Sequence, residues 1–359
     1  MLHGQQALGV EPVVVTPDDG GICAELRQQG VRVHILNYRP CLYPYWRTCR
    51  DYLLALPRMA ARLVINARAV RQLTSIIKKE HVDFVHTNVG VVSIGYRAAC
   101  RAGVPHIYHI REYADLDFQM YHFPSRAAFR RKLSRSWSVC ITADIQRHHR
   151  QDGNPRSRVI YDAVGPCIEA LPPRAATEPY YLFAGRVEPA KGLLDLLRAY
   201  DVDIPLKVAG SLSSGKYLDE CRGVVRERRL PVEFLGQRDD LPQLQRQALA
   251  QIVPSRFEGF GLCMPEGMRQ GCLAIGRNTG GTREQFQNGV RLTGQPIGFP
   301  YDTPAELTRL LAHVASLSPA EADAMRQRAL HVTNQLYTTD VSARRLHDFY
   351  TEILTSLTV

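Results

Sequence analysis

The chain has 359 residues, which is enough for two domains of ordinary size, each with its own core. Its composition, 45% hydrophobic and 22% charged, is typical of a soluble globular protein and excludes a disordered one. The net charge of +10 indicates an anionic partner, which could be a nucleic acid, a phosphate-bearing substrate or an acidic membrane face.

The nine cysteines are scattered and form neither a CxxC pair nor a Cys/His spacing suited to zinc. Residues 1–10 lack the apolar core of a signal peptide, so we expect a cytoplasmic protein. No apolar run approaches the ~18 to 20 residues that a membrane-spanning helix needs. Any contact with a membrane is therefore expected to be peripheral.

The first half begins with alternating elements: a strand at 13–16, a helix around 22–29 and a strand from residue 31. Such alternation predicts a parallel sheet covered by helices. A doubly wound domain that binds phosphate usually opens with a strand, a Gly-rich turn and a helix. Residues 2–8 instead resemble the end of a helix with no strand before it. We therefore expect the first strand and the Gly-rich loop of this domain to be missing.

An Arg-rich, apolar segment at residues 39–73 includes Trp46 and should be helical on both sides of Pro57, where a proline breaks or kinks a helix. The carboxyl end of a strand at 82–88 then carries two candidate site residues, and a second strand at 106–110 is followed by two more. These four residues are His86, Asn88, Arg111 and Glu112. Ligands bind off the carboxyl ends of parallel strands, so these side chains should line a crevice. The alternative is a core histidine at 86 and a surface charge at 111.

Residues 126–137 place Phe129, Leu133 and Trp137 four residues apart, flanked by Arg130, Arg131, Lys132 and Arg135. At helical spacing this is an apolar stripe bordered by cations, as in a helix that lies on an anionic membrane surface. The alternative is a basic helix whose apolar stripe packs on the core of the protein.

Four prolines within residues 166–179 mark a linker. It separates a domain at 1–165 from a domain at 180–337. The second domain restarts the alternation, with strands at 180–185, 205–210, 232–236, 251–254 and 273–277, and helices at 192–200, 217–229, 241–249 and from 282 onward. The last ~55 residues are predicted to be helical.

Two cations lie at the first strand-to-helix turn of the second domain. The strand ends at Gly185-Arg186, and Lys191-Gly192 opens the following helix. Cationic side chains beside the N-terminal amides of a helix can neutralise a pyrophosphate without a metal ion. The alternative is a pair of surface cations.

The sequence VPSRFEGFGLCMPE at residues 253–266 places two carboxylates around a short Gly-rich loop. Gly259 and Gly261 allow the backbone to approach a ligand closely, and Pro265 suits the first position of a helix. Exposed amides between Glu258 and Glu266 would face an anion, and the carboxylates would face hydroxyls. This pattern predicts a sugar-nucleotide site; the alternative is an ordinary turn with two solvated glutamates.

The motifs together resemble those of the retaining glycosyltransferases of family 4, also called group 1. The resemblance rests on AGRVEPAKG at 184–192, PSRFEGFGLCMPEGM at 254–268 and a Gly-Gly pair followed by Glu284. In the first half it rests on VDFVHTN, GVPHIYHIRE and VIYDAV. One departure is Arg111-Glu112, where many members carry a histidine.

The resemblance implies a GT-B fold, which is an α/β architecture of two Rossmann-like domains with a cleft between them. It also implies that the C-terminal helix, within residues 338–359, crosses back to the first domain. The donor would be a nucleotide-sugar, UDP- or GDP-linked, with no separate cofactor and no metal. The acceptor, a glycan or a lipid-linked molecule, would enter through the first domain.

The family pattern also implies roles for individual residues. Arg186 and Lys191 would hold the donor pyrophosphate, and Glu266 would bind the ribose hydroxyls. Glu258 would engage the sugar and phosphate together with the backbone of the loop, formed by Gly259, Phe260, Gly261 and Leu262, beside Gly185. Transfer would occur with retention, through front-face attack, with the leaving phosphate taking the acceptor proton and cations and amides stabilising its charge.

Other functions fit parts of the sequence. Asp115-Leu116-Asp117 is formally the DxD motif of metal-dependent GT-A enzymes, but four residues separate it from the preceding strand. A nucleotide-sugar isomerase could share the GT-B scaffold, and so could a catalytically silent partner of another transferase. Nucleic-acid binding is least supported. We expect a cytoplasmic, membrane-peripheral glycosyltransferase, assigned to cell-surface polysaccharide or glycolipid assembly by family association.

Overall fold

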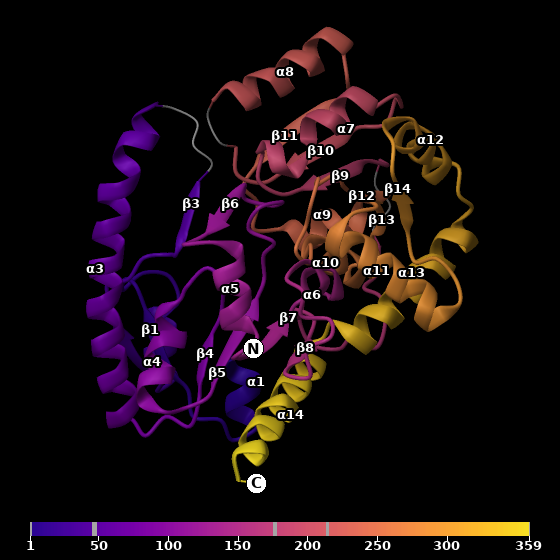
Figure 1. Cartoon of the computed structure of the whole chain (residues 1–359). Helices are drawn as coiled ribbons and strands as arrows, with labels where there is room; N and C mark the ends of the chain where they lie inside the picture. The colour runs from indigo at the N-terminus through magenta and orange to yellow at the C-terminus, as the bar shows by residue number, and fades with distance from the viewer. Residues whose placement is uncertain (1, 45–48, 175–177, 213–214, 359) are drawn as a thin grey trace. The chain divides into compact units, whose positions relative to one another are not determined.

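A computed structural model of the chain describes residues 2–44, 49–174, 178–212 and 215–358. Trp46 and residues 175–177 of the expected linker lie outside them. The chain divides into two compact units, which we describe separately (Figure 1). Unit 1 comprises Met1–Ile160 and Ser342–Val359, and unit 2 comprises Tyr161–Val341. Among the described helices, none is both long and apolar enough to cross a lipid bilayer.

Unit 1 alternates short strands with helices. Its elements are α1 (Leu2–Ala7), β1 (Val13–Thr16), α2 (Cys23–Gln28), β2 (Arg32–Ile35), β3 (Leu42–Pro44), α3 (Cys49–Lys79), β4 (Val85–Thr87), α4 (Ile94–Ala102), β5 (His106–Ile110), β6 (Met120–His122), α5 (Arg126–Leu133), β7 (Trp137–Cys140), α6 (Ala143–His148) and β8 (Ser157–Val159). The parallel strands form a four-stranded sheet, β4-β5-β7-β8, and a separate pair, β1-β2; β3 and β6 are antiparallel.

The C-terminal helix α14 (Thr339–Thr358) contributes to the core of unit 1. Its residues Leu346, Phe349 and Ile353 are buried against Ile107 and Val139 of the four-stranded sheet. Their spacing of three and four places all three on one face of the helix. A segment from the end of the sequence therefore completes a core built mostly from the first 160 residues.

Unit 2 is a single parallel sheet flanked by helices. Its elements are β9 (Tyr181–Ala184), the 3₁₀-helix η1 (Pro189–Lys191), α7 (Leu193–Ala199), β10 (Leu206–Ala209), α8 (Lys216–Arg228), β11 (Val232–Gly236), α9 (Leu241–Gln247), β12 (Ala250–Val253), α10 (Cys263–Arg269), β13 (Leu273–Arg277), α11 (Gly280–Thr293), β14 (Phe299–Tyr301), α12 (Pro304–Ala315) and α13 (Pro319–Leu336). The strand order is β11-β10-β9-β12-β13-β14. Strands β10 and β11 therefore lie on one side of β9, and β12, β13 and β14 follow on its other side.

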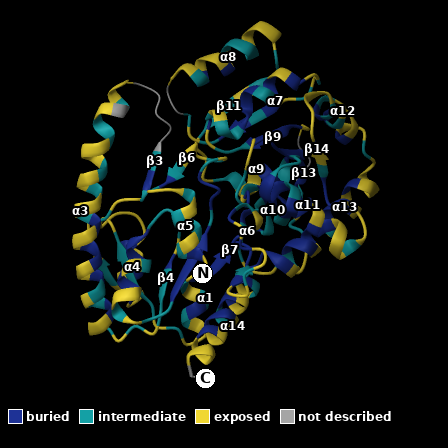
Figure 2. Cartoon of the chain, viewed as in Figure 1, coloured by how far each residue is buried: buried dark blue, intermediate teal, exposed yellow. Residues whose placement is uncertain are grey.

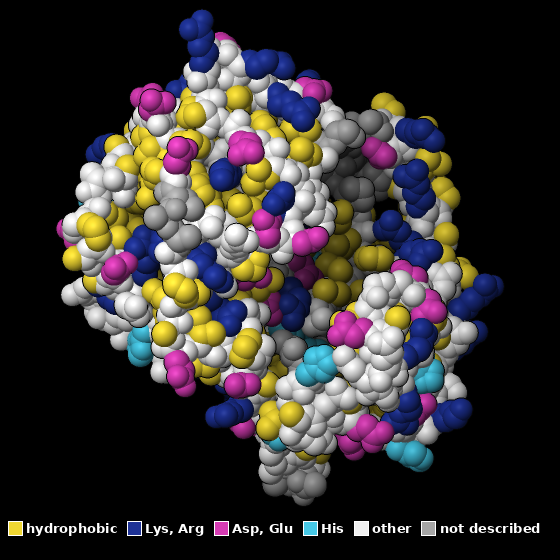
Figure 3. All heavy atoms as spheres, turned by 180° about the vertical axis from the view of Figure 1, so that it is seen from behind, with side chains coloured by type: hydrophobic (Ala, Val, Ile, Leu, Met, Phe, Trp, Pro, Cys, Tyr) yellow, Lys and Arg dark blue, Asp and Glu magenta, His cyan; other side chains and the backbone are white. Residues whose placement is uncertain are grey.

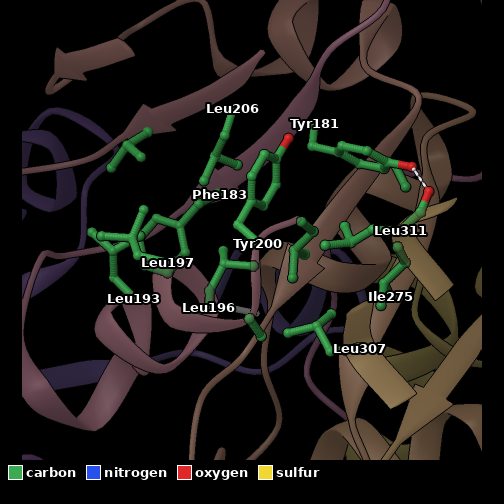
Figure 4. Close-up of a cluster of buried hydrophobic side chains, with 14 of the residues drawn as sticks. Tyr181, Phe183, Leu193, Leu196, Leu197, Tyr200, Leu206, Ile275, Leu307 and Leu311 are labelled. Carbon is green, nitrogen blue, oxygen red and sulfur yellow. Dashed lines mark hydrogen bonds between the residues drawn. The ribbon is translucent and has the colours of Figure 1, made fainter. Parts of the chain in front are cut away.

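The core of unit 2 explains why its strands are apolar on both faces. Tyr181 and Phe183 of β9 meet Leu196 and Leu197 of α7 on one face (Figure 4). Tyr180 and Leu182 are buried in a second cluster on the other face. Strands covered on both sides lose the usual alternation of polar and apolar residues. Figure 2 shows the sheet of unit 2 as mostly buried within its exposed helices.

Helix α3 confirms the expected helix on both sides of Pro57 and shows that the proline does not break it. It runs for 31 residues without interruption, with Pro57 inside it. Proline removes only one hydrogen bond, from its own missing N–H, and the turns on either side can keep theirs. Its C-terminal half also packs on the core through Val70, Leu73 and Ile77, which stabilises the helix beyond the proline.

Helix α5 corrects the membrane interpretation of residues 126–137. The helix ends at Leu133, and Trp137 starts strand β7, so the three residues of the expected stripe do not share one helix. Phe129 and Leu133 are buried, at 2% and 0% exposure. The ring of His122 stacks on Phe129 at 3.7 Å between centroids. The apolar side of α5 therefore faces the core and is not available to a lipid surface.

Three smaller boundaries also differ from the prediction. The strand expected at 82–88 begins only at Val85, the helix expected from residue 282 begins at Gly280, and Pro265 is the third residue of α10 rather than the first. All three changes are within the few residues by which ends of elements are usually uncertain from sequence.

Candidate functional site

The sheet order of unit 2 fixes where a ligand can bind. Strands β9 and β12 are paired neighbours in the middle of the sheet. The chain adds β10 and β11 on the outer side of β9, and β13 and β14 on the outer side of β12. In open parallel sheets, the crevice at such a switch point, off the carboxyl ends of the strands, is the usual ligand site. The loop after β9 holds Arg186 and Lys191, and the loop after β12 holds Glu258. The two loops that the sequence singled out therefore emerge side by side.

The two loops touch at a glycine. Gly192 has a φ of +72°, and a Cβ there would lie 2.2 Å from the carbonyl oxygen of Pro254. The amide of Arg256 donates to the carbonyl of Ala190 over 3.1 Å. Only glycine allows both this backbone conformation and this close approach. Gly192 thus fixes the distance between the loops that carry the charged side chains.

Lys191 and Glu258 form an ion pair across the two loops. The Lys191 Nζ lies 2.7 Å from Glu258 Oε1, and the side chains are 27% and 13% exposed. A charge-assisted hydrogen bond of this length holds both groups in defined positions. The pair remains partly open to solvent, so an anion and a hydroxyl could reach it. Arg186 is more exposed and pairs with Glu188, 3.1 Å away.

Helix α11 holds the backbone of the loop after β12. Gly281 donates its amide to the carbonyl of Glu258 over 2.8 Å, and Gln285 Nε2 donates to the carbonyl of Phe260 over 2.6 Å. A Cβ on Gly281 would lie 2.6 Å from the Cα of Phe260. The Phe260 ring is buried against Tyr161 and Tyr337. The Gly-rich loop is therefore fixed by packing and hydrogen bonds.

The same loop has amides that the protein itself does not use. Within the described residues, no group accepts a hydrogen bond from the amides of Phe260, Gly261 or Leu262. Phe260 and Gly261 are buried and Leu262 is exposed. Buried backbone donors are nearly always paired in native proteins. Unpaired amides beside Lys191 therefore fit an anionic ligand.

The remaining predicted donor residues surround this loop. Glu266 lies in the first turn of α10 and is half-buried, and burial raises the pKa of its carboxyl group. Gly185 directly follows β9, and Gly210 packs so closely on it that a Cβ would lie 2.0 Å from the Gly185 carbonyl oxygen. Gly259 is half-buried between Glu258 and Phe260. All of the predicted donor residues thus come from the two loops or from α10, which directly follows the loop after β12.

Glu284 has a different position from the other motif glutamates. Its Oε1 accepts a hydrogen bond from Tyr161 over 2.9 Å, and its side chain is buried. No pattern in the sequence predicts that Gln285 and Gly281 support the loop. The Gly-Gly pair before Glu284 was the available signal, because paired glycines often mark a close backbone approach.

In unit 1, two of the four predicted acceptor residues lie together. Asn88 follows β4 and Arg111 follows the neighbouring strand β5, and Arg111 Nε donates to Asn88 Oδ1 over 3.2 Å. Glu112 is buried and accepts hydrogen bonds from the amides of Val91 and Arg111, both at 3.1 Å. Burial raises the pKa of Glu112 to about 7. This edge of the sheet therefore holds a carboxyl group that can change charge near neutral pH.

His86 lies within β4 and is engaged on both ring nitrogens. Its Nδ1 lies 2.5 Å from the hydroxyl of Tyr350, and its Nε2 lies 3.2 Å from Nδ1 of His109. Burial lowers the pKa of His86 to about 4, so the ring is neutral at pH 7. A role for His86 toward an acceptor stays a prediction.

The DxD carboxylates are engaged by other groups of unit 1. Asp115 pairs with Arg126 and lies 2.8 Å from Nε2 of His148. Asp117 accepts the amide of Tyr113 over 2.9 Å. The two carboxylates thus hold the loop after β5 in place.

Comparison with known families matches both halves of the chain. Residues 1–163 match the family model described as "Glycosyl transferase 4-like domain", and residues 170–330 match the one described as "Glycosyl transferases group 1". A protein of Methanocaldococcus jannaschii, described as an uncharacterized glycosyltransferase, is 26% identical over 227 residues. The match covers 62% of this chain and 62% of that protein, so it spans less than two thirds of the relative's length.

Solved structures match over nearly the whole chain. A glycosyltransferase from Rickettsia africae has a TM-score of 0.75 at 18% identity, covering 97% of this chain and 92% of its own. The Anabaena protein HepE in complex with UDP-glucose has a TM-score of 0.70 at 17% identity, covering 98% of this chain and 94% of its own. At these identities, the likeness concerns the fold.

Proposed function

The chain belongs to the group 1 glycosyltransferases and has the GT-B fold, and we propose that it transfers a sugar from a nucleotide-sugar donor to a glycan or lipid-linked acceptor. Family membership and fold class confirm the prediction from the motifs. The observation that carries the activity is the Lys191–Glu258 pair, 2.7 Å apart, at the switch point of the unit 2 sheet. This pair joins a site for an anion to a site for hydroxyl groups.

In the proposed complex, the donor pyrophosphate takes the place of Glu258 as the main partner of Lys191. Arg186 and the free amides of Phe260, Gly261 and Leu262 bind the same phosphates. Glu258 then accepts hydrogen bonds from the transferred sugar, and Glu266 accepts them from the ribose hydroxyls. Because the lysine, the arginine and the amides together neutralise the phosphates, this arrangement needs no metal ion.

The reaction we propose proceeds with retention. The acceptor hydroxyl attacks from the face that the leaving group departs from, and its proton passes to the leaving phosphate oxygen. Lys191 and the loop amides stabilise the negative charge that grows on this phosphate, and they are already in position before the reaction starts. The protein therefore needs no separate general base.

The identity of the donor is proposed at the level of its class. HepE, which shares the fold, was solved with UDP-glucose, and this supports a UDP-hexose, with a GDP-hexose as the second candidate. We place the acceptor side in unit 1, near Asn88, Arg111, Glu112 and His86. We further propose a cytoplasmic enzyme, peripheral to a membrane, that acts in cell-surface polysaccharide or glycolipid assembly.

A panel of nucleotide-sugars tests the proposal. Thermal shift measures binding, and release of the nucleoside diphosphate measures turnover with and without candidate acceptors. We expect Lys191→Ala and Glu258→Ala each to lower transfer by about 100-fold or more, the range for loss of one preorganised charge-stabilising group. Lys216→Ala and Glu227→Ala replace exposed residues of α8 and serve as matched controls.

Three outcomes would contradict the proposal. Near-normal turnover in both site variants would overturn the site assignment. Donor binding without turnover on any acceptor would indicate a silent nucleotide-sugar-binding partner. Conversion of the nucleotide-sugar in the absence of an acceptor would indicate an isomerase on the same fold.

A further inference from the structure

Helix α3 of unit 1 is apolar on two different faces. One face is buried: Ala69, Val70, Leu73 and Ile77 pack in the core with Leu36 and Ile94. The other face runs from Leu53 to Ala67 and is exposed to solvent. It consists of Leu53, Leu56, Ala60, Leu63, Val64 and Ala67, which we call the α3 stripe. The core of unit 1 accounts for the first face only.

The spacing of the α3 stripe shows that it is one continuous surface. Its members follow one another at intervals of three and four residues, with Leu63 and Val64 adjacent, and such residues align along one side of a helix. Leu53 and Leu56 are 79% and 82% exposed, and Val64 is 54% exposed. Single exposed leucines are common, but a row of them along one helix marks an interaction surface.

The charges on α3 indicate what kind of surface it contacts. The helix has seven basic residues and a single acidic one, Asp51, which lies 3.9 Å from Arg58. Arg50, Arg68 and Arg71 are exposed beside the stripe. Figures 1 and 2 show α3 as a long helix whose outer side is exposed along most of its length. Dark-blue side chains follow the corresponding right-hand edge in Figure 3.

We propose that the α3 stripe docks unit 1 on the surface of an anionic lipid bilayer. The leucines and valine would enter the boundary between headgroups and acyl chains, while the arginines reach the phosphates. In this arrangement the apolar side chains contact the acyl chains and the basic side chains contact the lipid phosphates. A second copy of the chain fits less well, because it would bring two arginine-rich helices together. The inference specifies the membrane contact in the proposed function, yet it rests on residues outside the donor site.

Vesicle binding by the full chain tests the apolar part. The probes are phosphatidylcholine vesicles with and without phosphatidylglycerol, and the measurement is the fraction of protein that floats with them. Wild type should bind the phosphatidylglycerol vesicles. Leu53→Ser combined with Leu56→Ser should weaken this binding at least about tenfold, since two large apolar side chains leave the interface. Both residues are largely exposed, so thermal unfolding should be unchanged.

The matched control replaces exposed leucines on another helix. Leu354 and Leu357 of α14 are 38% and 59% exposed, and Leu354→Ser combined with Leu357→Ser should leave vesicle binding unchanged. An equal loss in this variant would show non-specific adhesion of apolar residues and would overturn the assignment to α3.

The charge part has its own variants. Arg68→Gln combined with Arg71→Gln should weaken binding to phosphatidylglycerol vesicles, and rising salt should weaken wild-type binding. Arg344→Gln combined with Arg345→Gln, on exposed positions of α14, should have little effect. Binding that is independent of both phosphatidylglycerol and salt would contradict a charged lipid surface.

Two readouts separate this inference from the rest. A nucleotide-sugar thermal shift that is unchanged in the leucine variant shows that the donor site is intact. Absence of vesicle binding by wild type overturns the membrane inference even if transfer is observed.

Sedimentation tests the alternative partner, a second copy of the chain. A dimeric wild type together with a monomeric leucine variant would show that the α3 stripe binds a second copy and would overturn the membrane inference.

Discussion

At the scale of single residues, the candidate site depends on glycines more than on its charges. Lys191 and Glu258 can meet only because their loops touch, and the loops touch only because Gly192 has no side chain. The distance between two charges is thus set by a residue that has none. This separates the residues that contact the donor from the one that positions them.

Gly192→Ala should therefore impair both stability and donor binding. The new Cβ would lie 2.2 Å from the carbonyl oxygen of Pro254, at a positive φ that alanine rarely adopts. Strain from the backbone and the overlap should lower the free energy of unfolding by about 2 to 4 kcal/mol. Denaturant unfolding measures this change, and a nucleotide-sugar titration measures the donor affinity.

Gly223→Ala is the control for this prediction. Gly223 lies inside α8, and nothing lies within 4 Å of a Cβ placed there. Alanine should raise the free energy of unfolding by up to about 1 kcal/mol, because it is the better helix former. Equal behaviour of the two variants would show that the contact with Pro254 has no energetic weight.

Glu112 should make the stability of unit 1 depend on pH. Burial raises the pKa of this carboxyl in the folded state to about 7, from 4.5. Folding therefore favours the protonated carboxyl. Glu112 contributes its full stabilisation of the folded state below about pH 4.5, and this stabilisation is lost as the pH rises to about 7. Between these two pH values, the free energy of unfolding should fall by up to about 3 kcal/mol because of Glu112.

Glu112→Gln isolates this effect. Glutamine cannot ionise, so the difference in unfolding free energy between wild type and the variant should shift against wild type from pH 4.5 to 7.5. Other titrating groups cancel in the difference. A difference that stays constant over this range would show that folding does not raise the pKa of Glu112.

At the scale of elements, the sequence was most informative where one physical cause acts alone. The strand at 232–236 and the strand at 273–277 were predicted with the bounds that the structure has. A short apolar run between turn-forming residues is compatible with few other secondary structures, so both of its ends can be predicted. The packing alternative for Phe129 and Leu133 is confirmed, but a single helix as far as Trp137 is wrong, because equal spacing cannot show that a helix stops at Leu133. The order of strands in the sheet was also hidden, since pairing is a long-range property.

Helix α3 provides a test at this scale, because Pro57 lies within its exposed stripe and before the part that packs on the core. Pro57→Ala restores a donor for the carbonyl of Leu53 and removes a ring from the helix interior. The free energy of opening the N-terminal half should rise by up to about 3 kcal/mol, the difference between alanine and proline in a helix. Hydrogen exchange of the amides in the first turns of α3 measures it. Unchanged protection there would mean that the helix already ends at Pro57 in solution.

The candidate site was predictable in its residue types but not in its supports. Lys191, Glu258 and the glycines between β12 and α10 were identifiable because phosphates and hydroxyls require cations, amides and carboxylates. Gln285 and Gly281 were not, since they act through the backbone of a loop 20 or more residues away in sequence. Such contacts depend on where α11 lies, which no local pattern determines.

At the scale of the whole molecule, each unit has a core of its own. The core of unit 2 lies between its sheet and helices such as α7 and α12. The core of unit 1 includes Phe349 and Leu346 from the end of the chain. Residues 342–359 are therefore required by a domain whose other residues come before residue 161. A substitution in residues 342–359 should therefore change the stability of the domain formed by residues 1–160.

Two separate cores predict two unfolding transitions that respond to different perturbations. A nucleoside diphosphate binds only the folded site of unit 2 in our proposal, so UDP should raise one transition, by about 2.7 kcal/mol at a hundredfold excess over its Kd. Phe349→Ala removes a buried ring from unit 1 and should lower the other transition by about 3 to 5 kcal/mol. Scanning calorimetry of wild type and variant, with and without UDP, measures both shifts. If UDP and Phe349→Ala moved one common transition, the units would unfold together and the ligand would stabilise the chain as a whole.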